Sequence, residues 1–217
     1  MKTFYIVRHG ETLLNLLNRS QGWADSPLTK KGIRQAVNLG EKVRQQAITF
    51  DAAFSSDTGR ARQTAQVILD HSGNGETPIK ELFDLREASF GLFEGADNDE
   101  MWEEGGKAVG EPDMSRKSPI DQKIKALTGI KKLDTIDYAE DFHDLKRRIL
   151  ALKHTMMQTE AANILVVTHS LYICCMLYVL IGEDLTIGKV PNCSVTKMTY
   201  NSNKNFKLEY IGRTQEL

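Results

Sequence analysis

Three short apolar segments constrain the fold of this chain more than any other feature, because each is followed by polar residues and then by a helical pattern. They span residues 3–7, 50–56 and 163–167 and are rich in β-branched or aromatic residues, as buried strands usually are. Strands that alternate with helices are typical of a parallel sheet with helices on both faces. The sequence therefore predicts a three-layer α/β/α sandwich with a mostly parallel central sheet.

Helical periodicity fills most of the intervals between these segments. Helices are expected at residues 30–46, 58–69, 141–158 and 171–181, and two final strands at 194–200 and 206–211. Thr29 is the expected N-cap of the first helix. The apolar face of that helix should pack against the sheet, and it comprises Ile33, Ala36, Val37, Gly40, Val43 and Ala47.

The pattern breaks off between Glu94 and Glu140, where acidic residues are followed by basic ones, including Arg116, Lys117 and Lys123. A segment this long is usually a lid or another functional insertion when it interrupts a compact domain. A solvated surface excursion with short helices of its own is the alternative, because charge runs often mark solvated faces. We expect one domain over residues 1–217, with residues 94–140 as a lid or specificity insertion within it.

Charge and hydropathy exclude several classes of protein. The net charge is -1, from 28 basic and 29 acidic residues, whereas general nucleic-acid binders are clearly basic. The longest apolar stretch, residues 171–181, is shorter than the roughly 20 residues that cross a bilayer. The first apolar run ends at Arg8 and His9, too early for a signal peptide. Three cysteines provide no disulfide framework, so we expect a reducing, cytoplasmic setting. The oligomeric state is left open.

Polar side chains with chemical potential follow all three predicted strands. Arg8 and His9 end the first, Arg60 follows the second, and His169 ends the third. Like ends of parallel strands lie at one edge of a sheet, where ligands bind, and Gly10 permits a sharp turn there. A lone histidine would most simply satisfy a strand end. Two histidines and two arginines together match a tetrahedral dianion, because arginine binds phosphate and neutral imidazole is a nucleophile.

The sequence contains neither the spacing of a metal site nor that of a nucleotide site. No H-x-x-x-H or C-x-x-C pair is present, although such pairs commonly supply metal ligands. A Gly-rich loop ending in Lys-Ser or Lys-Thr, which marks many NTPases, is also missing. We therefore expect no metal and no cofactor, with cationic side chains stabilising the phosphoryl charge instead.

In combination, five motifs resemble those of the histidine phosphatase superfamily, also called the phosphoglycerate mutase-like family. The resemblance covers most of the chain apart from the insertion and the last strands. The motifs are RHGET at 8–12, QGWADSPLTKKGIRQA at 21–36, SSDTGRARQTA at 55–65, LRE at 85–87 followed by GLFEG at 91–95, and VVTH at 166–169.

The resemblance implies a catalytic role for five residues. His9 becomes phosphorylated, and Arg8, Arg60 and His169 hold the phosphoryl group that is transferred. Glu87 donates a proton to the departing oxygen and later takes one from water, as a general acid and base. An imidazole nucleophile divides the hydrolysis into two displacements, and phosphoryl transfer depends chiefly on positioning and charge stabilisation.

The resemblance also implies substrate contacts by Asn15, Gln21 and Gly22. Thr168 and Ser170 are a departure, since glycines commonly flank the second histidine in the family. Their hydroxyls are expected either to add hydrogen bonds to the substrate or to crowd the site.

The function expected from these features is a metal-independent phosphomonoesterase that acts on a small phosphorylated metabolite. A phosphoglycerate mutase is the alternative, because it uses the same phosphohistidine and returns the phosphoryl group to the substrate. Mutases that resemble this family typically carry more sequence between the first helix and the third motif, so the phosphatase is favoured. A binding or regulatory protein with a degenerate site is disfavoured, because all five catalytic residues are present.

Overall fold

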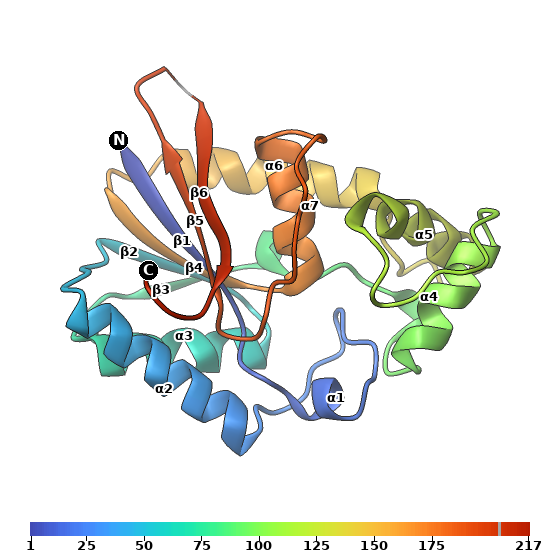
Figure 1. The fold of residues 1–217 in the computed structure, drawn as a ribbon, viewed down its shortest axis with the longest axis horizontal. Helices are drawn as coiled ribbons and strands as arrows, with labels where there is room; N and C mark the ends of the chain where they lie inside the picture. The colour runs from blue at the N-terminus through green and yellow to red at the C-terminus, as the bar shows by residue number, and fades with distance from the viewer. Residues whose placement is uncertain (204) are drawn as a thin grey trace.

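A six-stranded sheet forms the centre of the protein, as a computed structural model that describes residues 1–203 and 205–217 shows (Figure 1). Its strand order is β3-β2-β4-β1-β5-β6. The first four strands in this order are parallel, and β5 and β6 are antiparallel to their neighbours. The strands are β1 (Lys2–Arg8), β2 (Ala52–Ser56), β3 (Ile79–Leu82), β4 (Asn163–Thr168), β5 (Val195–Tyr200) and β6 (Phe206–Arg213).

Helices cover both faces of the sheet and bury the middle of β1, residues 4–7, on both sides. Phe4 and Ile6 pack with α6 and α7, whereas Tyr5 and Val7 pack with α2 and α3. Strands that are buried on both faces have continuous apolar sequences, so the predicted three-layer sandwich is confirmed. The helices are α1 (Leu13–Leu16), α2 (Lys30–Gln45), α3 (Gly59–Ser72), α4 (Asn98–Lys107), α5 (Ile120–Leu133), α6 (Phe142–Met157) and α7 (Ser170–Leu180).

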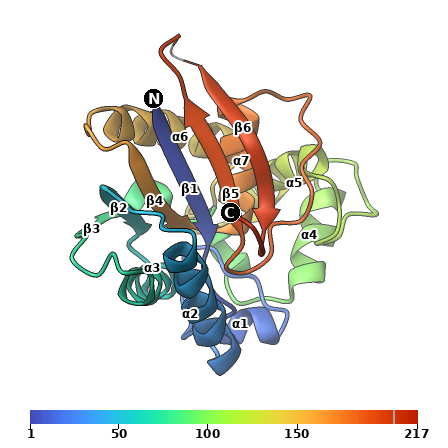
Figure 2. The same cartoon turned by 60° about the vertical axis from the view of Figure 1, so that its left-hand side comes forward.

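The antiparallel pair extends the sheet on the side of β1 that faces away from β4. Figure 2 shows β5 and β6 side by side next to β1, with β6 at the edge. Among the described residues, none of the helices is both long and apolar enough to cross a membrane.

Helix α2 begins as the sequence predicts, but its buried face is rotated. The Thr29 side chain accepts a hydrogen bond from Gly32 N at 3.0 Å, which confirms the N-cap. The prediction that Ile33 and Ala47 face the sheet is wrong, because both are exposed, while Leu39 is buried. A Cβ atom at Gly32 would lie 2.1 Å from the Glu11 carbonyl oxygen. Close approach of these two backbones sets the rotation of the helix.

The insertion folds into two helices, α4 and α5, which pack against each other. A Cβ atom at Gly129 of α5 would lie 1.8 Å from the carbonyl oxygen of Gly105 in α4. The two backbones are therefore in direct contact, and only glycine permits this approach. The segment thus contains helices, as the alternative of a surface excursion expected, and its role as a lid stays a prediction.

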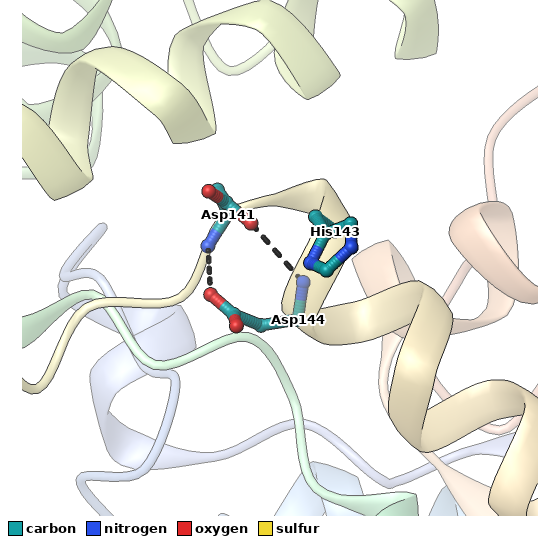
Figure 3. Close-up of side chains that lie close together, drawn as sticks. All are labelled: Asp141, His143 and Asp144. Carbon is teal, nitrogen blue, oxygen red and sulfur yellow. Dashed lines mark hydrogen bonds between the residues drawn. The ribbon is translucent and has the colours of Figure 1, made fainter.

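The start of α6 is held by a reciprocal pair of carboxylates (Figure 3). Asp141 accepts from Asp144 N at 3.1 Å, and Asp144 accepts from Asp141 N at 3.2 Å. Lys131 of α5 forms ion pairs with both. His143 lies beside them. Each of the three side chains offers one atom that could bind a metal ion, and these atoms lie within 4.8 Å of one another. The hydrogen bonds and Lys131 account for both carboxylates, so this cluster is a helix cap that also ties the insertion to α6.

Candidate active site

The ends of β1 and β4 bring two histidines together. Arg8 is opposite Thr168 in the parallel register, and His9 N donates to Thr168 O at 2.9 Å. The imidazole centroids of His9 and His169 lie 5.2 Å apart, with an angle of 59° between the rings. The parallel register thus places side chains that are 160 positions apart in one pocket.

The backbone carbonyl of Gly10 determines the tautomer of His9. His9 Nδ1 lies 2.7 Å from Gly10 O, and a carbonyl oxygen can only accept, so Nδ1 carries the proton. The lone pair of the neutral ring is then on Nε2. Burial lowers the pKa of His9 well below its usual value, and the positive charges of Arg60 and Arg8 lower it further. His9 is therefore a neutral imidazole with a free nucleophilic nitrogen.

Arg60 is almost completely buried, at 1% exposure, and its guanidinium is held by the loop that precedes α2. Nη1 donates to Ala24 O at 2.8 Å and to Asp25 Oδ1 at 2.9 Å, and Nη2 donates to Gly22 O at 2.7 Å. This loop therefore fixes the orientation of the guanidinium plane.

Arg60 in turn determines the tautomer of His169. Nη2 of Arg60 lies 3.0 Å from His169 Nδ1, and a guanidinium only donates, so Nδ1 is the acceptor. The neutral ring then carries its proton on Nε2. The pKa of His169 is lowered well below its usual value by burial first and by Arg60 and His9 next. His169 thus offers an N–H donor at neutral pH without carrying a charge.

Three buried donors of this site have no hydrogen-bond partner in the part of the chain that the structure describes: Arg8 Nε, Arg60 Nε and His169 Nε2. An unsatisfied buried donor typically costs about 1–3 kcal/mol, and such groups are rare in native proteins. A tetrahedral oxyanion would supply acceptors for them. The site therefore has the donor set of a phosphate pocket.

Glu87 lies next to this donor set at the N-terminus of α7. It is 6% exposed and accepts from Leu171 N at 3.0 Å, Tyr172 N at 2.8 Å and Ala88 N at 3.1 Å. Burial raises its pKa, although the three N–H groups and Arg60 oppose the shift. A carboxyl group with a raised pKa is suited to proton transfer near neutral pH.

The residues expected to contact substrate, Asn15 of α1 and Gln21 and Gly22 of the loop before α2, also bind neighbouring residues. Asn15 Oδ1 accepts from Thr12 N at 3.3 Å and from Asn192 Nδ2 at 3.2 Å. Gln21 bonds Thr12 Oγ1, and with its amide turned, its oxygen accepts from Arg60 Nη1 at 3.2 Å. Gly22 supplies a carbonyl oxygen to Arg60. These three residues thus adjoin the groups that hold Arg60 and His9, and their contact with a substrate stays a prediction.

The two hydroxyls that flank His169 differ in availability. Thr168 is fully buried, and its Oγ1 donates to Leu85 O at 2.6 Å. Its hydroxyl therefore joins β4 to the segment that carries Glu87. Ser170 is half-buried at the first position of α7, and its hydroxyl is the one of the pair that remains available to a ligand.

Sequence reasoning missed four residues that hold the catalytic groups. Asp25 pairs with Arg60, and Glu94 binds the loop that contains Asp25. Thr64 Oγ1 accepts from Gly10 N at 3.0 Å, and Asn192 Nδ2 donates to His9 O at 3.0 Å. Asp25, Thr64 and Glu94 lie inside the recognised motifs, which was the available signal. Asn192 lies outside them and is placed only by the tertiary fold.

The basic residues of the insertion separate into two groups. Arg116 is exposed, and it bonds Asn18 Oδ1 at 2.9 Å and lies 3.7 Å from Asp99. Lys117 is also exposed. Lys123 is half-buried, and its Nζ donates to Arg116 O at 2.7 Å and lies 5.5 Å from the Trp102 ring centroid.

Lys123 lies close enough to the active site for charged residues there to affect its pKa. Burial lowers the pKa of Lys123, and Glu87 and Arg8 are among the charged groups close enough to affect it. In the described part of the chain, Lys123 forms no ion pair with a carboxylate. It is therefore the basic residue of the insertion best placed to meet an anionic ligand.

Comparison with known proteins gives one family. A model of the histidine phosphatase superfamily (branch 1) matches residues 4–212. The chain is 33% identical over 227 aligned positions to "Probable phosphoglycerate mutase GpmB" of Yersinia pestis (strain Pestoides F), covering 100% of this chain and 95% of that protein.

Solved structures agree with this result. A phosphoglycerate mutase from Bacillus anthracis str. Sterne superposes with a TM-score of 0.88 at 36% identity, covering 99% of this chain and 94% of the other. The α-ribazole phosphatase from Shigella flexneri has a TM-score of 0.75 at 23% identity, covering 98% and 96%, and supports the fold alone. Of these three relatives, the two above 30% identity are thus both named as phosphoglycerate mutases.

Proposed function

Because this chain belongs to the histidine phosphatase superfamily, we propose that it is a metal-independent phosphomonoesterase acting on a small phosphorylated metabolite through a phosphohistidine. The observation that carries the proposal is the neutral His9 with its lone pair on Nε2, next to three buried donors that lack partners. A nucleophile and a phosphate cradle in one pocket are what phosphoryl transfer requires.

The reaction proceeds in two displacements. Nε2 of His9 attacks phosphorus while the bond to the leaving oxygen breaks, and Glu87 gives that oxygen its proton. Water then attacks the phosphohistidine, Glu87 takes a proton from it, and the N–P bond breaks to release inorganic phosphate. Arg8, Arg60 and the Nε2–H of His169 stabilise the phosphoryl oxygens in both steps.

A panel of phosphorylated metabolites tests this function directly. The purified protein should release inorganic phosphate from at least one small phosphomonoester, with and without EDTA at the same rate. Absence of turnover on every ester and on aryl phosphates would reject the proposal, and so would an activity that EDTA removes and one divalent ion restores.

Phosphoglycerate mutase activity is the second candidate, and the names of two relatives at 33% and 36% identity favour it. A mutase returns the phosphoryl group to the substrate, whereas a phosphatase transfers it to water. Incubation with 3-phosphoglycerate and bisphosphoglycerate separates the two. Conversion to 2-phosphoglycerate faster than phosphate release would identify a mutase.

We also propose that residues 94–140 act as a lid within a single domain, and that Lys123 reads an anionic group remote from the phosphate. Its half-buried amine lies beside Trp102, and the charges of Glu87 and Arg8 are close enough to affect its pKa, which supports this. The protein would work in a reducing cytoplasm, a setting that its three free cysteines support.

Replacing Lys123 with methionine should raise KM for a substrate that carries a second anionic group by about 10-fold, the size of one hydrogen bond to a charged group. Nitrophenyl phosphate lacks such a group and should keep its KM. Lys117→Met is the matched control, since this lysine is exposed, and it should change neither constant. Equal effects of Lys123→Met on both substrates would show that Lys123 does not read the remote group.

The lowered pKa values of His9 and His169 predict how ring protonation and the stability of the fold change as the pH falls. Both rings stay neutral as the pH falls through 6.5, where an unperturbed histidine gains its proton. The unfolded chain takes up these two protons and the folded chain does not, so the free energy of unfolding decreases below about pH 6.5. Histidine ring signals in NMR spectra, assigned by single substitutions, should not titrate between pH 8 and 6. A midpoint near 6.5 for either ring would contradict this.

A further inference from the structure

We infer that Glu94, the first residue of the insertion, is a positioning residue for the phosphate-binding Arg60. This inference rests on the proposed function, because it concerns how that pocket is held in shape. No atom of Glu94 is bonded to Arg60, His9 or His169. Its charge is close enough to oppose the lowering of the Arg60 pKa, and its hydrogen bonds hold the loop of residues 22–25.

The Glu94 carboxylate gathers four backbone N–H groups. Oε2 accepts from Gly22 N and Ala24 N, both at 3.0 Å, and Oε1 accepts from Trp23 N at 2.8 Å and Phe90 N at 2.9 Å. Three of these donors are consecutive residues of one loop. A half-buried carboxylate that receives hydrogen bonds from a run of amides fixes the direction of each peptide plane in that run.

The same loop supplies the acceptors for Arg60. The carbonyl oxygens of Gly22 and Ala24 accept from its two Nη atoms at 2.7 and 2.8 Å, and Asp25 forms its ion pair at 2.9 Å. In residues 22 and 24, the N–H group therefore binds Glu94 and the carbonyl binds Arg60. Loss of Glu94 would free the amides of this loop. The loop carbonyls would then no longer hold the guanidinium of Arg60 in one orientation.

Apart from Glu94, this loop is held through two of its side chains: Asp25 accepts from Gly59 N at 2.6 Å, and Trp23 packs against Phe83 and Arg86. Residues 21–27 lie outside helices and strands, so no ladder of backbone hydrogen bonds holds them. Gly22 is packed closely enough that a Cβ atom would lie 2.1 Å from Ala88 O and 2.4 Å from Glu94 Oε1. The carboxylate of Glu94 is the group that holds the amides of the two residues whose carbonyls bind Arg60.

A displaced Arg60 has a kinetic signature that differs from that of a damaged proton donor. Arg60 would hold the phosphoryl oxygens in both displacements, whatever the leaving group is. Loss of Glu94 should therefore slow nitrophenyl and alkyl phosphates by the same factor, and it should weaken inhibition by inorganic phosphate and vanadate. Small errors in the placement of such a group reduce rates substantially.

The chain contains a matched control in Asp134. This carboxylate also lies in the insertion, is half-buried, and accepts from four backbone N–H groups, those of Leu92, Ile136, Tyr138 and Ala139. It has no bond to the loop of residues 22–25. Asp134→Asn therefore removes a similar amide network that has no direct hydrogen bond to the loop around Arg60, and its one link toward Glu94 is the amide of Leu92.

The experiment compares Glu94→Gln with Asp134→Asn by phosphate and vanadate inhibition and by turnover of both esters. Gln keeps one acceptor oxygen and puts an NH₂ group against the remaining amides. We expect Glu94→Gln to weaken both inhibitors by about 10-fold, the loss of roughly one charge-assisted hydrogen bond, with equal losses on the two esters. Asp134→Asn should leave inhibition by phosphate and vanadate unchanged, even if it lowers the melting temperature as much as Glu94→Gln does.

Arg60→Lys provides a second, independent measurement. Combined with Arg60→Lys, the Glu94→Gln change should have little further effect on inhibition, because interacting residues are non-additive. Where Glu94→Gln fails to fold, Glu94→Asp replaces it in this double-mutant cycle. Aspartate keeps the negative charge, but its shorter side chain places the carboxylate farther from the loop. Additive effects, or equal effects of the Glu94 and Asp134 variants, would overturn the inference. A wild-type protein that neither turns over esters nor binds vanadate would instead reject the proposed function.

Discussion

Replacing His9 with alanine should abolish turnover of every phosphomonoester. The lone pair on Nε2 is the nucleophile of the first displacement, and Gly10 O fixes its direction. Without it the covalent route is closed, so the loss should exceed the roughly 10²–10⁴-fold that a general acid contributes. The fold should survive, because one hydrogen bond from the ring is lost while the backbone bonds of His9 to Thr168 and Asn192 remain.

The covalent intermediate gives this prediction its measurement. Rapid quench of the wild-type protein with labelled substrate should trap an acid-labile phosphoenzyme, and peptide mapping should place the label on the peptide that contains His9. The variant should show no label while it retains vanadate binding within about an order of magnitude, since Arg8, Arg60 and His169 remain. Label on a serine or a cysteine would contradict the mechanism.

Replacing Glu87 with glutamine should impair poor leaving groups far more than good ones. An alkoxide needs a proton as its bond to phosphorus breaks, whereas nitrophenolate leaves without one. The loss on an alkyl phosphate should approach the roughly 10²–10⁴-fold of general acid catalysis. With nitrophenyl phosphate, phosphorylation of His9 should continue, and hydrolysis of the phosphoenzyme should become slow. An initial burst of nitrophenol would then report accumulation of the phosphoenzyme.

The position of Glu87 suggests that its replacement could lower activity through lost stability alone. The ratio of the activity losses on the alkyl and nitrophenyl esters tests this explanation. Its carboxylate caps the N-terminus of α7 through Leu171 N and Tyr172 N, so glutamine in its place should also reduce stability. A purely structural defect lowers the amount of active protein and affects both substrates by one factor. A ratio near one would therefore remove Glu87 from the catalytic residues.

Arg148 fixes the backbone of the segment that carries Glu87. Its guanidinium pairs with Glu140 at 2.7 Å and donates to the carbonyls of Asp84, Arg86 and Glu87 at 3.0–3.1 Å. The last residue of the insertion thus holds the segment that carries the proton donor, while Glu94 at its start holds the loop around Arg60. Both borders of the insertion contribute to the pocket.

The sequence alone determined the layers of this protein and the edge of the sheet that carries the pocket. Apolar runs such as residues 163–167 report burial on both faces of a strand, and caps such as Thr29 report the start of a helix. Both signals are local, so they can be read without a partner. The residues that follow the strands, Arg8, His9 and His169, were placed by the parallel topology that those runs imply.

Only the tertiary structure decided how those residues are set for chemistry. The proton positions of the two imidazoles depend on Gly10 O and on Arg60, and the latter is 109 positions away from His169. Arg60 is supported by Asp25 and Glu94, which come from separate segments of the chain. The rotation of α2 depends on a backbone contact with Glu11. Hydrogen bonds and close contacts between distant segments leave no periodic signal in a sequence. They exist only once the hydrophobic layers have brought those segments together, because burial then requires each polar group to find a partner.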